Sequence, residues 1–164
     1  MEVVVKKILG ILIILGTGIF FLACTKEESV PFENLLSYKH SYVGDNSAVG
    51  GIISELPAGE TLDQFELRTS DQPYGIIVTY DTTSSKWHEE MSQNVMMYNS
   101  AAFFALVDNV EVVTFVLKGD KTEEVHFLRK EVEVLMSNPW SYYYESPDKW
   151  EQGLYKPLYM EVVD

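Results

Sequence analysis

The sequence of 164 residues contains one cysteine, Cys24, and few basic side chains. A single cysteine excludes a disulfide within the chain, so an exported domain must be stabilised by its core alone. Only 12 Lys and Arg oppose 25 Asp and Glu, which gives a formal net charge of −13. Such a surface is repelled by nucleic acid, so we expect no nucleic-acid partner. It is compatible with cationic partners or divalent ions, but the carboxylates are scattered along the chain, so the favoured interpretation is that they only solvate the surface.

Motifs for a catalytic, metal or cofactor site are absent as well. No two of the three histidines, His40, His88 and His126, have the four-residue spacing of two metal ligands on one helix face. His88-Glu89-Glu90 is typical of the solvated first turn of a helix. The chain has no Gly-x-Ser-x-Gly, and Gly50-Gly51 does not form a phosphate loop. We therefore expect no enzyme activity and no cofactor; the alternative is a hydrolase whose catalytic groups meet only in the fold.

The amino-terminal segment has the order of a bacterial secretory signal. Lys6 and Lys7 precede an uncharged, largely apolar run from Ile8 to Ala23, and Cys24 follows. This run is shorter than the roughly 20 residues of a spanning helix, which favours a cleaved signal peptide over a permanent anchor. An uncleaved anchor with Cys24 as an ordinary thiol is the alternative.

Phe21-Leu22-Ala23-Cys24 resembles the bacterial lipobox, in which a small residue precedes a modified cysteine. The resemblance implies cleavage before Cys24, a diacylglyceryl thioether on its sulfur and often a further acyl chain such as palmitate on the new amino group. We therefore expect a lipoprotein on the outer face of the bacterial cytoplasmic membrane, held there through at least two acyl chains. Residues 1–23 would be the signal peptide, 24–30 a polar tether and 31–164 a single domain.

The patterning of this domain predicts an α+β fold. Alternating apolar residues predict four strands, and helical periodicity predicts a long central helix with shorter helices before and after the strands. Because the strands form two hairpins, we expect an antiparallel four-stranded sheet with helices packed mainly on one face. Gly119-Asp120 predicts a two-residue turn, and Gly50-Gly51 indicates close approach of another backbone. The predicted strands are Leu62–Thr69, Tyr74–Asp81, Glu111–Lys118 and Glu123–Arg129, and the predicted helices are Pro31 to about Tyr38–His40, Val49–Leu56, Trp87–Val107, Lys130–Ser137 (favoured over a strand) and one turn over Asp148–Gln152.

Two segments are weak candidates for ligand or partner contact. Gly44, Asp45 and Asn46 could present backbone amides and side-chain oxygens to a small ligand, but a helix cap explains them equally and is favoured. Asp108-Asn109 is interpreted as a turn. The aromatic tail could grip sugar rings or a partner protein, or it could wrap the domain and fill the edge of its core, which is favoured. The tail candidates are Trp140, Tyr142, Tyr143 and Tyr144.

Several segments, taken together and in order, resemble one family. They are Leu36-Ser37-Tyr38-Lys39, Tyr42-Val43-Gly44-Asp45-Asn46-Ser47, Val49, Leu67-Arg68-Thr69, Pro73-Tyr74-Gly75-Ile76 and Ala105-Leu106-Val107-Asp108-Asn109-Val110. Over about Leu35 to Leu128 the chain resembles the bacterial domain-of-unknown-function family numbered 4825. The resemblance implies a small exported or lipid-anchored domain of Gram-positive bacteria, in some relatives an extracellular appendage of membrane metallopeptidase sensors. It implies no catalytic residue, and this chain has no His-Glu-x-x-His.

These observations favour a lipid-anchored, extracytoplasmic binding or regulatory module that is not an enzyme. Its expected contacts are the membrane, through the lipid on Cys24, and an envelope sensor, another membrane protein or a peptide-like ligand. An envelope hydrolase and a passive structural lipoprotein remain the alternatives.

Overall fold

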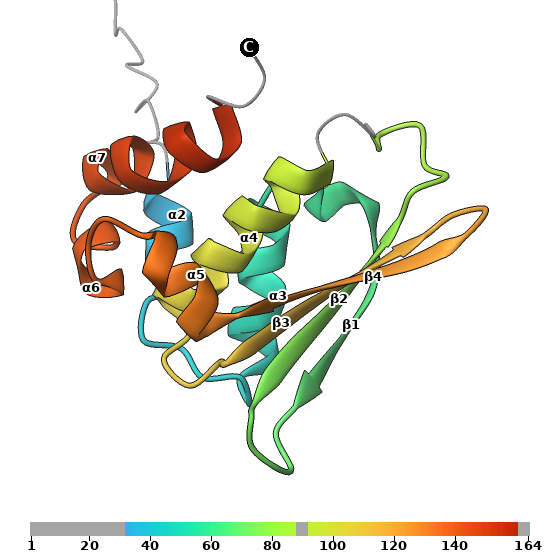
Figure 1. Ribbon diagram of the computed structural model, residues 1–164, viewed down its shortest axis with the longest axis horizontal. Helices are drawn as coiled ribbons and strands as arrows, with labels where there is room; N and C mark the ends of the chain where they lie inside the picture. The colour runs from blue at the N-terminus through green and yellow to red at the C-terminus, as the bar shows by residue number, and fades with distance from the viewer. Residues whose placement is uncertain (1–31, 88–91, 161–164) are drawn as a thin grey trace, which may run out of the picture.

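The computed structural model describes residues 32–87 and 92–160. Helices precede, separate and follow two pairs of consecutive strands (Figure 1). The elements are α2 (Glu33–Leu36), α3 (Asn46–Glu55), the 3-10 helix η1 (Gly59–Thr61), β1 (Leu62–Arg68), β2 (Gly75–Asp81), α4 (Ser92–Leu106), β3 (Val112–Lys118), β4 (Thr122–Leu128), α5 (Arg129–Leu135), α6 (Trp140–Tyr143), α7 (Pro147–Trp150) and the π-helix η3 (Glu151–Met160). The predicted signal peptide and tether lie outside the described residues.

The four strands form one sheet in the order β1-β2-β3-β4. β1 and β2 pair as an antiparallel hairpin, and so do β3 and β4, as predicted. The expectation of a wholly antiparallel sheet is wrong, because β2 and β3 run parallel. The helix α4 connects them and returns the chain to the starting end of β2, so β3 runs in the same direction. Parallel neighbours need a crossover of this kind, whereas a short turn suffices within each hairpin.

The predicted strand boundaries are correct to within one residue at every end. Alternation of buried and more exposed residues is clearest in β1, whereas β2 and β3 are rich in β-branched and aromatic residues that favour strands. The β3–β4 turn is longer than predicted. Lys118 pairs with Thr122, so Gly119, Asp120 and Lys121 all lie in the turn.

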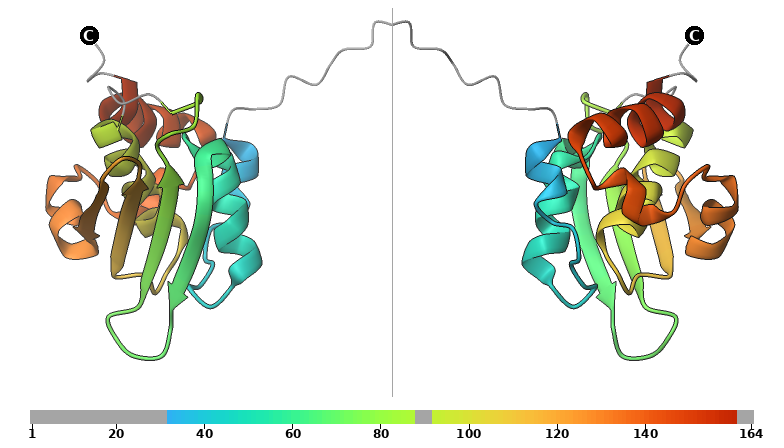
Figure 2. Two further views of the ribbon diagram at one scale, coloured as in Figure 1. Left: turned by 90° about the vertical axis from the view of Figure 1, so that its right-hand side faces the viewer. Right: turned by 90° about the vertical axis from the view of Figure 1, so that its left-hand side faces the viewer.

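The helices lie on one face of the sheet, as predicted. One view of Figure 2 shows the strands with no helix in front of them, and the opposite view shows the helices in front. Between the sheet and the helices lies one core, to which β2, β3 and α4 contribute most of the fully buried side chains. The other face of the sheet, which we call the open face, is not covered by any described element.

The long helix differs from its prediction at its start. Trp87 lies outside a helix, and the described helix α4 spans Ser92–Leu106. The predicted apolar stripe is confirmed for the described residues, since Val95, Tyr98 and Leu106 are buried. His88-Glu89-Glu90 and Met91 lie outside the described residues.

The helix α3 agrees with its prediction, but its two glycines have a different role from the one expected. A Cβ added at Gly50 would lie 3.5 Å from the Phe65 ring, which is an ordinary van der Waals distance. A Cβ added at Gly51 would overlap the ring of Tyr38. The close neighbours are therefore aromatic side chains, and the prediction of a close backbone is wrong.

The carboxyl-terminal third forms more helix than predicted. The helix α5 confirms the favoured assignment after β4, and α7 covers the single turn expected near Asp148. The following π-helix η3 was not predicted, because Gly153 and Pro157 interrupt a helical pattern. Trp150 and Leu154 from this tail are completely buried. Among the described helices, none is long and apolar enough to cross a membrane.

Candidate functional site

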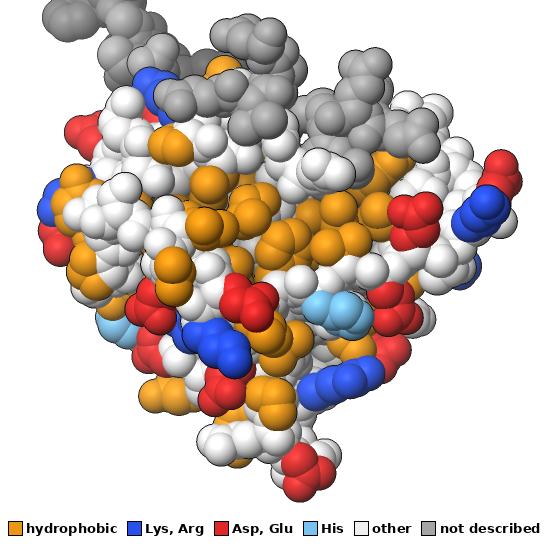
Figure 3. Space-filling model, viewed as in Figure 1, with side chains coloured by type: hydrophobic (Ala, Val, Ile, Leu, Met, Phe, Trp, Pro, Cys, Tyr) orange, Lys and Arg blue, Asp and Glu red, His pale blue; other side chains and the backbone are white. Residues whose placement is uncertain are grey.

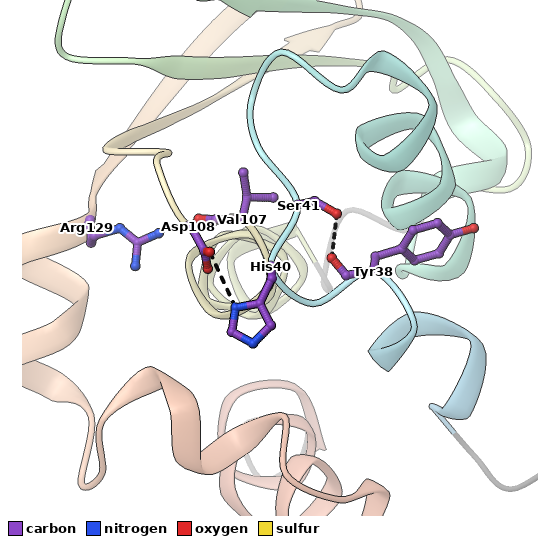
Figure 4. A network of polar contacts seen from close by, with 6 residues as sticks. All are labelled: Tyr38, His40, Ser41, Val107, Asp108 and Arg129. Carbon is purple, nitrogen blue, oxygen red and sulfur yellow. Dashed lines mark hydrogen bonds and ion pairs between the residues drawn. The ribbon is translucent and has the colours of Figure 1, made fainter.

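A cluster of polar residues surrounds the carboxyl end of α4 (Figure 4). His40 Nδ1 lies 3.3 Å from Asp108 Oδ2, and the two side chains are 58% and 39% exposed. The backbone of His40 adopts a left-handed conformation (φ 65°), and its ring meets the Tyr144 ring edge to face at 5.1 Å. The cluster therefore forms a surface ion pair when His40 is protonated, and such exposed pairs contribute little stability.

Backbone hydrogen bonds hold the two halves of this cluster together. The Ser41 amide donates to Leu106 O at 3.1 Å, and the Asp108 amide donates to Ser41 O at 2.9 Å. Asn109 Oδ1 accepts a further bond from the Val43 amide at 2.8 Å. The predicted turn at Asp108-Asn109 is confirmed, and it also fixes the loop that precedes α3.

Arg129 supports the same end of α4 from the opposite side. Its Nη2 donates to Val107 O at 2.6 Å and its Nε donates to Val110 O at 2.7 Å. The guanidinium also lies over the rings of Phe104 and Trp140, at 5.3 and 5.9 Å from their centroids. Burial lowers the pKa of Arg129, and nearby carboxylates oppose this effect. Sequence reasoning missed this residue, because one arginine at the junction of a strand and a helix carries no motif.

His40, Ser41 and Asp108 do not form a nucleophile and base. The Ser41 hydroxyl donates to Tyr38 O at 2.5 Å, and Figure 4 shows it on the side of the loop away from the imidazole. Nucleophilic catalysis requires a hydrogen bond between hydroxyl and base, with the base oriented by a third group. Of these two contacts, only the one between the base His40 and the orienting group Asp108 is present. The cluster therefore orders the loop, and Ser41 is not activated as a nucleophile.

The predicted contact residues before α3 act mainly as a helix cap. Asp45 Oδ1 accepts a bond from the Ala48 amide at 2.9 Å, which confirms the favoured interpretation. Asn46 is the first residue of α3 and is exposed, and no atom lies within 4 Å of a Cβ built at Gly44. Gly44 and Asn46 thus remain accessible at the surface.

The four aromatic tail candidates pack against their own domain. Tyr143 is buried, and its hydroxyl accepts a bond from the Asn138 amide at 3.1 Å. Trp140 contacts Phe104, Tyr142 contacts Tyr143, and Tyr144 contacts His40. The structure does not bring these side chains together as one exposed platform. Val134 and Leu135 of α5 are 83% and 65% exposed. Figure 3 shows hydrophobic side chains gathered on the face of the molecule that is turned to the viewer in Figure 1.

The open face of the sheet contains a shallow hollow of about 400 Å³ that reaches across all four strands. Its floor comes from the two central strands, and its rim comes from the edge strands and from Lys118 at the end of β3. The lining residues are Asp63, Gln64, Glu66 and Arg68 of β1, Ile77 and Thr79 of β2, Val116 and Lys118 of β3, and Thr122 and Glu124 of β4. Ile77 and Val116 are the apolar residues of this lining, and its other residues are polar or charged. Concave surfaces are the usual binding sites of proteins.

Polar contacts order the rim of this hollow. Lys118 Nζ donates to Asp63 Oδ2 at 2.9 Å, which raises the pKa of Lys118. His126 Nδ1 lies 3.0 Å from Thr114 Oγ1, and its Nε2 lies 3.8 Å from Glu124 Oε2. The sequence pattern predicted which residues share a face of each strand. It did not predict the hollow, because the hollow depends on the order of the strands in the sheet, and this order is set by the crossover between β2 and β3.

In residues 32–87 and 92–160, no three His, Cys, Asp or Glu side chains come together as metal ligands would. A family model described as "Domain of unknown function (DUF4825)" matches residues 35–128, which is more than half of the chain. No curated protein and no solved structure matches the chain.

Proposed function

The chain belongs to the DUF4825 family of domains of unknown function, and from this premise we propose that it is a lipid-anchored binding module outside the cytoplasm. It is attached through Cys24 and acts by contact with an envelope protein or a peptide-like ligand. The observation that carries the proposal is the hollow on the open face. A concave sheet face that no described element covers is a surface to which another molecule can bind.

The position of the anchor supports this proposal. Only residues 25–31 separate Cys24 from Phe32, the first described residue. A fully extended tether of this length spans roughly 25 Å, so the domain would stay close to the membrane surface. The Phe32 ring contacts the ring of Tyr155 in η3 at 5.0 Å. The helix η3 lies at the end of the molecule opposite the β1–β2 turn (Figure 2). The open face runs between these ends and stays accessible from the side.

The net charge supports a partner that is not the lipid surface itself. A chain of charge −13 is repelled by anionic headgroups, so the acyl chains are needed for attachment and the domain surface remains available to proteins. The exposed His40–Asp108 pair fits a contact surface better than catalysis, because the neighbouring Ser41 hydroxyl donates to Tyr38 O and not to the imidazole.

The experiment combines a labelled fatty acid with crosslinking in intact cells. We expect the wild-type chain to incorporate the label, and Cys24→Ser to remain an unlabelled precursor. We also expect a reproducible crosslinked partner for the wild type. Label in the Cys24→Ser chain would refute the anchor, and the absence of any reproducible partner would refute the binding role.

A further inference from the structure

The floor of the open face is two strands wide and combines two apolar side chains, Ile77 and Val116, with two threonines. Ile77 pairs with Thr114, and Thr79 pairs with Val116, so their side chains alternate along the floor. Thr79 and Thr114 are only 6% and 8% exposed, although no described element covers them. Thr114 Oγ1 lies 3.0 Å from His126 Nδ1, and Ile77 and Val116 are the two apolar side chains that line the hollow.

Two carboxylates stand on opposite sides of this floor without a lysine or arginine partner. Glu66 lies on β1 and Glu124 on β4, and both line the hollow. Among the described residues, Glu66 has no ion-pair partner and Glu124 has only His126, at 3.8 Å. The third carboxylate, Asp63, is already paired with Lys118. Two sites for a cation therefore flank the floor, one on each side.

The spacing of these groups fits a helix. Neighbouring strands lie about 4.8 Å apart, so the edge strands β1 and β4 are separated by roughly 14 Å. An α-helix with its side chains is about 10–12 Å wide and fits between the two rims. Strands of seven residues are about 23 Å long, which corresponds to roughly 15 helical residues. The opposite face of the same sheet is covered by helices, and sheets covered on both faces are a common architecture.

We propose that the open face binds an amphipathic helix of another protein whose apolar stripe is flanked on both sides by Lys or Arg. The apolar stripe covers Ile77 and Val116, and the flanking cations meet Glu66 and Glu124. Arg68 is the one cation of the rim that has no ion pair among the described residues, and it lies at the end of β1 next to the β1–β2 turn. The bound helix is therefore favoured with its carboxyl-terminal end, the negative end of its dipole, at Arg68. This inference rests on the proposed binding function and specifies its partner.

The experiment places the photoreactive residue p-benzoylphenylalanine at Gln64, an exposed position on the rim, in the full-length chain in its own membranes. A second chain carries it at Val134, which is exposed on α5, away from the open face. We expect crosslinking at Gln64, and we expect mass spectrometry to map the captured segment to a helix with apolar residues at helical spacing and flanking Lys or Arg. Capture of an acidic or non-helical segment at Gln64 would overturn the inference.

Charge reversal tests the two cation sites. We expect Glu66→Lys with Glu124→Lys to lower the crosslinking yield at Gln64 about tenfold, because like charges then face each other. The matched control is Glu55→Lys with Glu131→Lys, two exposed carboxylates on α3 and α5, which should leave the yield unchanged. Equal yields for the two double variants would overturn the inference. Crosslinking at Val134 alone would overturn it and leave the proposed function standing, whereas no crosslinking at either position would count against both.

Discussion

Trp150 donates its indole N–H to the hydroxyl of Tyr98 across 2.8 Å within the core. The two rings meet edge to face, with their centroids 6.4 Å apart. Because Tyr98 lies on α4 and Trp150 on α7, this bond joins the carboxyl-terminal tail to the central helix. The tail is thus a structural part of the domain.

A double-mutant cycle tests this bond. We expect Trp150→Phe and Tyr98→Phe each to lower the free energy of unfolding. The double variant should lose about 1 kcal/mol less than the sum of the two single losses, because both single variants remove the same hydrogen bond. Urea unfolding of the purified chain measures all three. The control cycle pairs Tyr98→Phe with Trp140→Phe, which share no hydrogen bond or ring contact in the described structure, and it should be additive.

High pH should destabilise the fold through two buried tyrosines. Burial raises the pKa of Tyr80 and Tyr98 above the ordinary value of 10.0. Below pH 10 both states keep these protons, and the stability is fully present. Above pH 10 the unfolded state releases them while the folded state does not, so each tyrosine lowers the free energy of unfolding by up to about 1.4 kcal/mol per pH unit.

Urea unfolding between about pH 9 and 11.5, a range that spans the ordinary tyrosine pKa of about 10, tests whether the free energy of unfolding falls as the pH rises. Tyr98→Phe should make the decline with pH shallower than in the wild type. Replacement of the exposed Tyr42 by Phe is the control and should leave the slope unchanged. A stability that rises with pH in this range would contradict the assignment of buried, neutral tyrosines.

The paired glycines of α3 should respond differently to the same change. Gly50→Ala should raise the free energy of unfolding by up to about 1 kcal/mol, because alanine is the better helix former and the new Cβ meets Phe65 at an ordinary distance. Gly51→Ala should give no gain or a loss, since its Cβ requires the Tyr38 ring to move. Thermal unfolding of both variants measures the difference, and equal gains would show that Tyr38 moves aside without cost.

Arg129→Met should cost about 2 kcal/mol of stability, because the carbonyls of Val107 and Val110 lose charge-assisted bonds. Arg129→Lys should recover only part of the loss, since an ammonium cannot reproduce the planar fork. The adjacent exposed Lys130 offers the control Lys130→Met, which should be nearly neutral. Urea unfolding measures all three, and a neutral Arg129→Met would remove this residue from the support of α4.

Asp45→Ala should lower the free energy of unfolding by about 1 kcal/mol, because the Ala48 amide at the start of α3 loses its acceptor. Asp45→Asn keeps an acceptor oxygen and should be close to the wild type. Asp71→Ala, at an exposed turn position, is the control. If all three variants unfold alike, Asp45 is not the cap of α3 in solution.

The sequence predicts those features that depend on near neighbours along the chain. Alternation in β1 and the β-branched and aromatic residues of β2 and β3 predict the strands, and Asp45 before an apolar stripe indicates the cap of α3. The parallel pairing of β2 with β3 depends on where α4 returns the chain, which no local pattern states. His40 and Asp108 lie 68 positions apart in the sequence, and their contact also depends on where α4 ends in the fold. The hollow is therefore a product of topology, and only its individual strands were predictable.

The family match ends at residue 128, but the buried interior does not. Val132, Tyr143, Trp150 and Leu154 all follow that point and are almost entirely inaccessible to solvent. A gene fragment cut at the end of the matched span would delete these side chains and expose the surface of α4 against which they pack. The span therefore records what relatives share in sequence, whereas a recombinant fragment that keeps this interior must extend beyond Leu154.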